Sequence, residues 1–161
     1  MGYIVGWQAF FTAITHIIFM SNFAERLKEL LFDKNITNKQ LAKDLGVSLW
    51  TVQRWQSREV EIRLSYLFAL AKYLRCSLDF LVGLSNNDSK PAHKEKLPKF
   101  STRIREIMKT KNISTYTLRK NLDIGNRYFQ TWDRGSDPKL STLLELANYF
   151  NCSLDDLVGL E

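Results

Sequence analysis

The sequence predicts an all-α protein built from two tandem copies of one five-helix domain. Residues 23–84 align with residues 100–160, and too many aligned residues are identical for chance, so the two segments should share a fold. Apolar residues recur at helical spacing in both segments. No run of alternating β-type residues of any length interrupts them. We name the two segments the first repeat and the second repeat.

Each of the five helices expected in the first repeat carries an apolar stripe. Ser48 and Ser77 have side chains that can cap the third and fifth helices, and Thr37 can cap the second. Gly46 can take the left-handed conformation that ends the second helix. Asp79 would lie in the first turn of the fifth, where the helix dipole favours negative charge. The apolar residues that these helices would bury are Phe23, Leu27, Leu30, Leu31, Leu41, Ala42, Leu45, Val52, part of Trp55, Leu67, Leu70, Ala71, Leu74, Leu78, Leu81 and Val82.

Residues 85–99, "SNNDSKPAHKEKLPK", separate the repeats. The segment is polar, contains Pro91 and Pro98 and has no apolar periodicity, which is typical of a linker. We therefore expect domains at residues 20–84 and 100–161. Each has a size that is marginal but workable for a single core.

The N-terminal residues 1–19 carry no charged side chain, and three interpretations stay open. They could precede the true start of the protein, because Met20 stands directly before the first repeat. Residues 1–20 are also long enough for a membrane span, although Gln8 and His16 dilute the segment. Finally, they could be an additional packing arm. If the segment did span a membrane, the basic residues that follow would keep the domains in the cytoplasm, so we expect a cytoplasmic protein in each case.

The composition argues against several classes of function. The two cysteines, Cys76 and Cys152, occupy equivalent places in the repeats and are expected to be reduced, packed residues. Neither His16 nor His93 lies near a cysteine at metal-ligand spacing. We find no catalytic set and no phosphate-binding Gly loop, so we expect neither an enzyme nor a cofactor. The net charge of +6 is compatible with a nucleic-acid partner.

The stretch "TNKQLAKDLGVSLWTVQRWQS" of the first repeat resembles the helix-turn-helix (HTH) of Cro/repressor-type regulators, the XRE-type proteins with the lambda-repressor-like fold. The tail "LFALAKYLRCSLDFLVGL" looks like the fourth and fifth helices of that family. The second repeat shares the resemblance through the duplication. The residues that match the family pattern are Thr37, Leu41, Ala42, Gly46, Val47, Ser48, Val52 and Trp55.

The resemblance implies that the third helix of each domain enters the major groove of double-stranded DNA. Arg54 could then pair with guanine and Gln53 with adenine, while Leu49 and Trp50 could contact thymine methyl groups. Trp55 and its equivalent Trp132 are expected in the cores instead. The residues expected to bind DNA in the first domain are Asn38, Lys39, Ser48, Leu49, Trp50, Gln53, Arg54 and Arg58, of which Asn38, Lys39 and Arg58 would meet phosphates.

The second repeat departs from the family pattern at two positions. Arg119 replaces the alanine at the helix crossing, and Asp123 replaces the turn glycine. Aspartate tolerates the left-handed conformation better than most residues, so the turn is expected to survive. The residues expected to bind DNA in this domain are Thr115, Tyr116, Asn126, Arg127, Gln130, Thr131 and Arg134.

The sequence thus predicts a DNA-binding transcriptional regulator with two reading heads, acting most simply as a repressor. The 15-residue linker has a flexible span on the order of 20 Å and an extended limit of about 50 Å, which permits heads one DNA turn apart. The alternative is that only the first domain binds DNA. The second domain, with a net charge of +1 against +3 for the first repeat, would then serve dimerisation or bind a protein partner such as a toxin.

Overall fold

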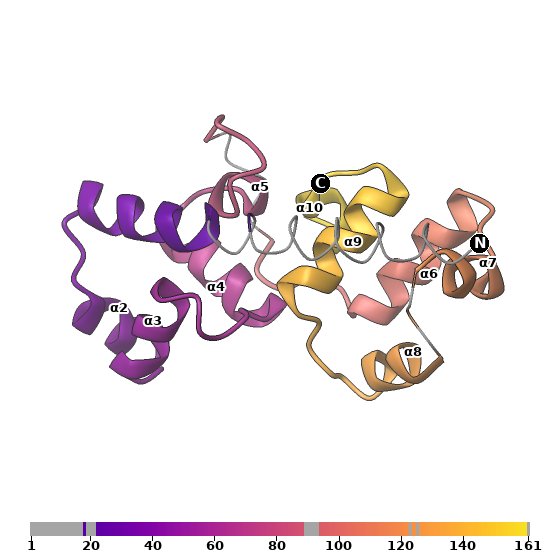
Figure 1. Cartoon of the computed structure of the whole chain (residues 1–161), viewed down its shortest axis with the longest axis horizontal. Coiled ribbons are helices and arrows are strands. Elements are labelled where there is room, and N and C mark those ends of the chain that lie inside the picture. The colour runs from indigo at the N-terminus through magenta and orange to yellow at the C-terminus, as the bar shows by residue number, and fades with distance from the viewer. Residues whose placement is uncertain (1–17, 19–21, 89–93, 123, 125, 161) are drawn as a thin grey trace, which may run out of the picture.

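The computed structural model describes residue 18 and residues 22–88, 94–122, 124 and 126–160. Within these residues the regular secondary structure is helical, and the only β-type pairing is one isolated bridge between Arg63 and Lys139. The predicted all-α fold class is confirmed, and Figure 1 shows two groups of helices side by side.

The first repeat begins with helical residues 22–33. The helices that follow are α2 (Asn38–Leu45), α3 (Leu49–Gln56), α4 (Leu64–Leu74) and α5 (Leu78–Leu81). The second repeat has the same succession of helices: α6 (Phe100–Thr110), α7 (Thr115–Asn121), α8 (Asn126–Asp133), α9 (Leu140–Phe150) and α10 (Leu154–Val158).

The predicted helix caps of the first repeat are confirmed. The Thr37 hydroxyl accepts from the Gln40 N–H at 3.1 Å, and the Ser77 hydroxyl accepts from the Phe80 N–H at 3.0 Å. Gly46 ends α2 in the left-handed conformation with φ 66°. Each cap satisfies a backbone group that a helix end leaves without an intrahelical partner, so the element boundaries follow from local sequence.

Each repeat encloses an apolar core in which the predicted tryptophan is buried. Trp55 is 2% exposed and Trp132 is 3% exposed. Trp132 packs edge-on against Phe100, with ring centroids 5.0 Å apart. The two cysteines are free; Cys76 is buried, and this burial raises the pKa of its thiol to about 12.

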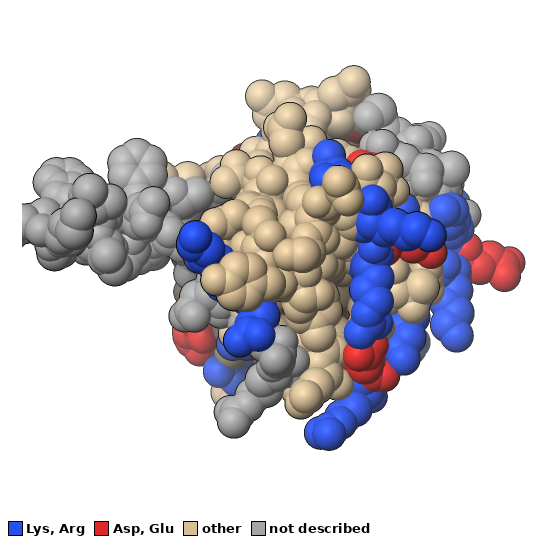
Figure 2. Space-filling view, turned by 90° about the vertical axis from the view of Figure 1, so that its right-hand side faces the viewer, with Lys and Arg blue, Asp and Glu red and all other residues tan. Residues whose placement is uncertain are grey.

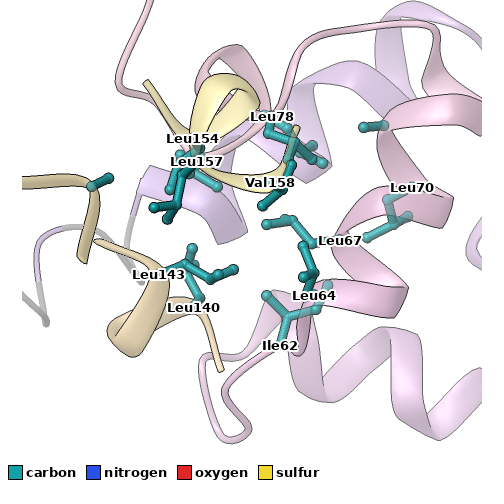
Figure 3. Packing of buried hydrophobic residues seen from close by; sticks show 14 of the residues in the cluster. Ile62, Leu64, Leu67, Leu70, Leu78, Leu140, Leu143, Leu154, Leu157 and Val158 are labelled. Atoms are coloured by element: carbon teal, nitrogen blue, oxygen red, sulfur yellow. The ribbon is translucent and has the colours of Figure 1, made fainter. Parts of the chain in front are cut away.

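The two repeats also share apolar packing. Figure 3 shows side chains of α4 and α5 turned toward side chains of α9 and α10. Leu67 and Leu78 from one side, and Leu143 and Leu157 from the other, are fully buried. Fully burying a side chain of this size is worth about 1.5–3 kcal/mol, so this interface contributes substantially to stability.

Backbone hydrogen bonds cross the same interface where α4 and α9 begin. The Leu64 N–H donates to the Pro138 carbonyl, and the Leu140 N–H donates to the Ile62 carbonyl, each at 2.9 Å. The Asp137 carboxylate accepts from the Ser65 N–H, and Glu61 accepts from the Ser141 N–H. The starts of these two helices are therefore capped from across the interface.

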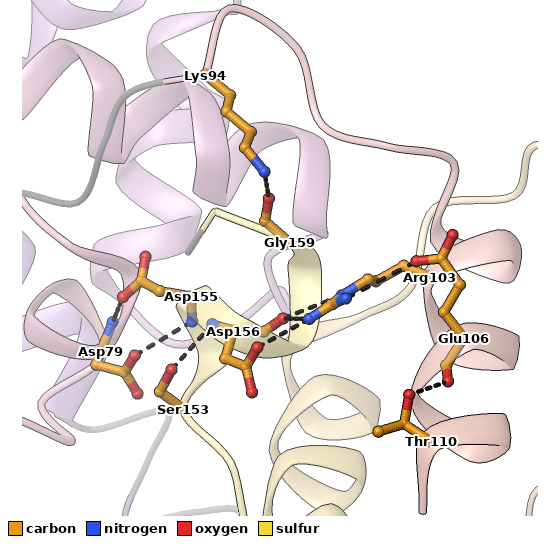
Figure 4. Close-up of polar contacts among 9 residues, drawn as sticks. All are labelled: Asp79, Lys94, Arg103, Glu106, Thr110, Ser153, Asp155, Asp156 and Gly159. Carbon is orange, nitrogen blue, oxygen red and sulfur yellow. Dashed lines mark hydrogen bonds and ion pairs between the residues drawn. The ribbon is translucent and has the colours of Figure 1, made fainter.

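Asp79 and Asp155 form a second pair of reciprocal caps. Asp155 accepts from the Leu78 and Asp79 N–H groups at 3.1 and 3.3 Å, and Asp79 accepts from the Leu154 and Asp155 N–H groups at 3.1 and 3.2 Å (Figure 4). Asp79 lies in the first turn of α5, as predicted. Its carboxylate also accepts hydrogen bonds from the start of α10, because the two short helices begin face to face.

These contacts change the expected role of the linker. Direct packing of α5 on α10 and the hydrogen bonds at the starts of α4 and α9 hold the repeats together, so the length of a flexible tether does not set their separation. From the described end of the linker, the Lys94 ammonium donates to the Gly159 carbonyl just after α10. The linker thus also helps to hold the C-terminal end of α10.

The expectations for residues 1–19 and for Asp123 concern positions that, residue 18 apart, lie outside the described residues. In the part of the chain that is described, none of the helices has the length and apolar character needed to cross a membrane.

The burial of Asp155 leads to a prediction about pH. Burial and the neighbouring Asp79 carboxyl raise its pKa to about 7, although the N–H groups of Leu78 and Asp79 act in the opposite direction. A raised folded-state pKa contributes stability that is full below the ordinary pKa of about 4 and is lost as the pH rises through 7. We expect the free energy of unfolding to fall by on the order of 2 kcal/mol between about pH 5 and pH 8 in urea titrations.

The matched control is Asp155→Asn, which keeps the size of the side chain but cannot ionise. Its unfolding free energy should vary much less over the same pH range. A wild-type stability that stays constant or increases toward pH 8 would contradict the prediction.

Candidate nucleic-acid interface

The turn between α2 and α3 is short because three residues satisfy its backbone. After the left-handed Gly46, the Val47 N–H donates to the Ala42 carbonyl at 2.9 Å. The Ser48 hydroxyl then accepts from the Thr51 N–H at 3.0 Å and caps α3. Buried Ala42, 4% exposed, lies on the core side of α2. The small residue and the short turn fix α3 against α2 with one face outward.

The faces of α3 differ sharply in exposure. Val52 is fully buried, whereas Leu49 is 41% and Trp50 is 62% exposed. Gln53 lies on the same outward face and is exposed. Two large apolar side chains therefore lie beside an exposed amide on this face. The outward face of α3, defined as Leu49, Trp50, Gln53 and Arg54, is therefore the candidate site.

Arg54 is held in place by two neighbours. Its guanidinium lies over the Trp50 ring, 4.3 Å from the centroid, and its Nε is 3.6 Å from a carboxylate oxygen of Glu59. Arg54 is half-buried as a result. An ordered guanidinium loses less side-chain entropy on binding than a free one. The sequence did not predict the ion pair of Arg54 with Glu59. Glu59 lies beyond the end of α3, and its distance from Arg54 along the chain is not one that pairs side chains on a helix.

The three residues expected at phosphates differ in their surroundings. Lys39 is exposed at the start of α2. Asn38 exchanges two side-chain hydrogen bonds with Gln56, at 2.8 and 2.9 Å. Arg58 forms an ion pair with Glu25 at 2.9 Å. The hydrogen bonds between Asn38 and Gln56 join α2 to the end of α3. The Asn38 side chain therefore supports the packing of these two helices in the free protein.

The second repeat has the same cap at its second helix. The Ser114 hydroxyl accepts from the Thr117 N–H at 3.0 Å. Thr115 and Tyr116 lie in the first turn of α7, and Tyr116 is 72% exposed. Arg119, which replaces the small residue at the helix crossing, is exposed.

The outward face of α8 is only partly described. Gln130 and Arg134 are exposed, while Thr131 is half-buried and donates to the Tyr128 carbonyl at 2.8 Å. Asn126 and Arg127 belong to α8, but their side chains lie outside the described part of the structure.

A bidentate ion pair fixes the end of α8. Arg105 of α6 donates to both carboxylate oxygens of Asp133, at 2.7 and 2.6 Å. Hydrogen bonding from Arg105 lowers the pKa of Asp133 to about 2. The pair Glu25–Arg58 links the first helix of the first repeat to the residues after α3 in a similar way. Sequence reasoning missed both pairs, because ion pairs between separate helices leave no local pattern.

Positive charge gathers at the end of the molecule that carries α8 without dominating it. Figure 2 shows Lys and Arg side chains gathered along one side of the end of the molecule where α6, α7 and α8 lie, with acidic side chains among them. Among the described residues, no group of three or more His, Cys, Asp or Glu is placed to hold a metal ion.

Comparison with known families supports the resemblance found in the sequence. Residues 27–81 match the helix-turn-helix family, and residues 103–161 match the Cro/C1-type HTH DNA-binding domain. Comparisons with curated proteins and with solved structures gave no significant match to the chain.

The different exposure of Trp50 and Trp55 gives a stability prediction. Trp55→Ala leaves a large cavity in the core and should cost about 3–5 kcal/mol of unfolding free energy. Trp50→Ala removes an exposed side chain, whose contact with Arg54 is worth about 0.5–1 kcal/mol. Chemical denaturation of both variants checks this. Equal losses would show that Trp50 is a core residue.

The Ser48 cap gives a second stability prediction. Ser48→Ala leaves the Thr51 N–H without its side-chain partner and should lower the free energy of unfolding by about 1 kcal/mol. Ser48→Asp keeps an acceptor at the same position and should remain within a few tenths of a kcal/mol of wild type. If urea unfolding shows the same loss for both variants, the hydroxyl does not act as a cap.

Proposed function

Because the chain contains two tandem helix-turn-helix domains of the Cro/C1 type, we propose that it regulates transcription by reading double-stranded DNA with α3 and α8. The observation that carries the proposal is the outward face of α3, where exposed residues follow a short capped turn. We assign the two domains to residues 20–84 and 100–161, in a cytoplasmic protein.

The first domain offers chemistry for several bases. Gln53 suits the N6 and N7 edge of adenine, and Arg54 suits the O6 and N7 edge of guanine. Leu49 and Trp50 offer apolar surface to thymine methyl groups. Trp50 also orders the Arg54 guanidinium, so one apolar side chain serves two purposes. Lys39 and the α2 amide groups would meet the DNA backbone.

The second domain offers a different set of contacts. Asn126, Arg127 and Gln130 can each form paired hydrogen bonds with a base edge. Thr115, Tyr116 and Arg134 would then lie near phosphates. Since the two outward faces differ in residue type, the DNA target should have two unlike halves. Occupying such a site at a promoter would block transcription, so we propose a repressor.

One observation favours a second candidate function. The second repeat carries a net charge of only +1, against +3 for the first repeat. In this alternative, α3 alone reads DNA, and the second domain is a support or binds a protein partner through α8.

Base selection by variants separates the two candidates. We would select bound duplexes from a random library with wild type, Arg54→Ala and Arg127→Ala at one salt concentration. Arg54→Ala and Arg127→Ala should each lower the free energy of DNA binding by about 1–3 kcal/mol. Each should also relax the base preference in one half of the selected sequence. Lys96→Ala removes one charge from the linker and is the matched control; it should leave every base preference unchanged.

If Arg127→Ala behaves like the Lys96→Ala control, α8 does not read bases and the second candidate function gains support. Failure of the wild-type chain to enrich any sequence would contradict DNA reading by either domain.

A further inference from the structure

The interface between the repeats is reciprocal in its backbone contacts. Ile62 and Pro138 hold equivalent places in the repeat, as do Leu64 and Leu140. The Leu64 N–H donates to Pro138, and the Leu140 N–H donates to Ile62, at the same distance of 2.9 Å. Each contact therefore occurs twice with the two repeats exchanged, which is the mark of an isologous interface with two-fold symmetry.

The side-chain contacts across the interface also occur in pairs related by interchanging the two repeats. Asp79 and Asp155 are equivalent residues, and each caps the short helix that carries the other. Arg63 and Lys139 are also equivalent, and they pair with each other in an antiparallel bridge. A residue can face its own equivalent in this way only close to the symmetry axis. The axis thus passes near this bridge and between α5 and α10.

The symmetry determines how the two candidate reading helices are related. Since α3 and α8 occupy the same place in the repeat, we expect the same approximate two-fold axis to relate them. In Figure 1 both helices lie along the lower side of the molecule, on opposite sides of the interface. Duplex DNA has two-fold axes perpendicular to its length, so heads related in this way match half-sites in inverted orientation.

The contact surfaces are already used within the chain. Leu78 and Leu81 of α5, and Leu154 and Leu157 of α10, are fully buried. A second chain could reach these surfaces only by displacing the other repeat, with the loss of their buried area. One chain therefore supplies both halves of the symmetric arrangement.

We propose that a single chain binds one duplex as an internal pseudo-dimer, whose ligand is a pair of unlike half-sites in inverted orientation at one fixed spacing. This inference rests on the proposed function, because it assumes that α3 and α8 read DNA. The fixed spacing follows from the direct packing of the repeats. A flexible tether would instead accept several spacings and both orientations.

The test makes the two reading helices alike. Gln130 already matches Gln53, so the substitutions Asn126→Leu, Arg127→Trp and Thr131→Arg give α8 the outward residues of α3. The reverse variant carries Leu49→Asn, Trp50→Arg and Arg54→Thr in the full chain. Each variant, and wild type, would select sequences from a random duplex library. Native mass spectrometry would then give the number of chains per duplex.

We expect each variant that folds to select an inverted repeat at the spacing of the two wild-type halves, with one chain per duplex. A duplex with the same halves as a direct repeat should bind at least about 10-fold more weakly. A direct repeat, a variable spacing or two chains per duplex would overturn the inference while leaving DNA binding intact. No enrichment with wild type would overturn the proposed function itself.

Discussion

The reciprocal capping between Asp79 and Asp155 is the interaction on which the arrangement of the two repeats depends. The first backbone N–H groups of a helix have no partner within the helix, so burying the starts of α5 and α10 would be costly without acceptors. Each aspartate supplies those acceptors to the other repeat at 3.1–3.3 Å. The leucines around them can then pack closely. One polar pair thereby makes an apolar interface possible and fixes its register.

Within each repeat, polar contacts outside the core orient the third helix. The Asn38–Gln56 amide pair joins α2 to the end of α3, and Arg105 holds Asp133 at the end of α8. The two repeats use different residues for this purpose. Their outward faces have also diverged, while the buried leucines of the last two helices are largely retained. The duplication therefore preserves the scaffold and the interface but changes the chemistry presented to a partner.

Local signals made much of the fold predictable from the sequence. Caps such as Thr37 and Ser77, the left-handed Gly46 and the apolar stripes act over a few residues, so the sequence contains them directly. The packing of one repeat on the other was not predicted. Asp79 was predicted in the first turn of its own helix, and nothing in the spacing shows that a second helix start lies opposite. The stacking of Arg54 on Trp50 and the ion pair with Glu59 were likewise invisible, since they depend on side-chain placement.

The central claim is that one chain reads two neighbouring segments of the major groove. Guanine N7 lies in that groove, so methylation interference on a duplex selected by the wild-type chain reports the contacts directly. The account predicts two groups of sensitive guanines, centred about one helical turn or 34 Å apart on one face of the duplex. A single group of sensitive guanines in a complex that contains one chain would contradict it.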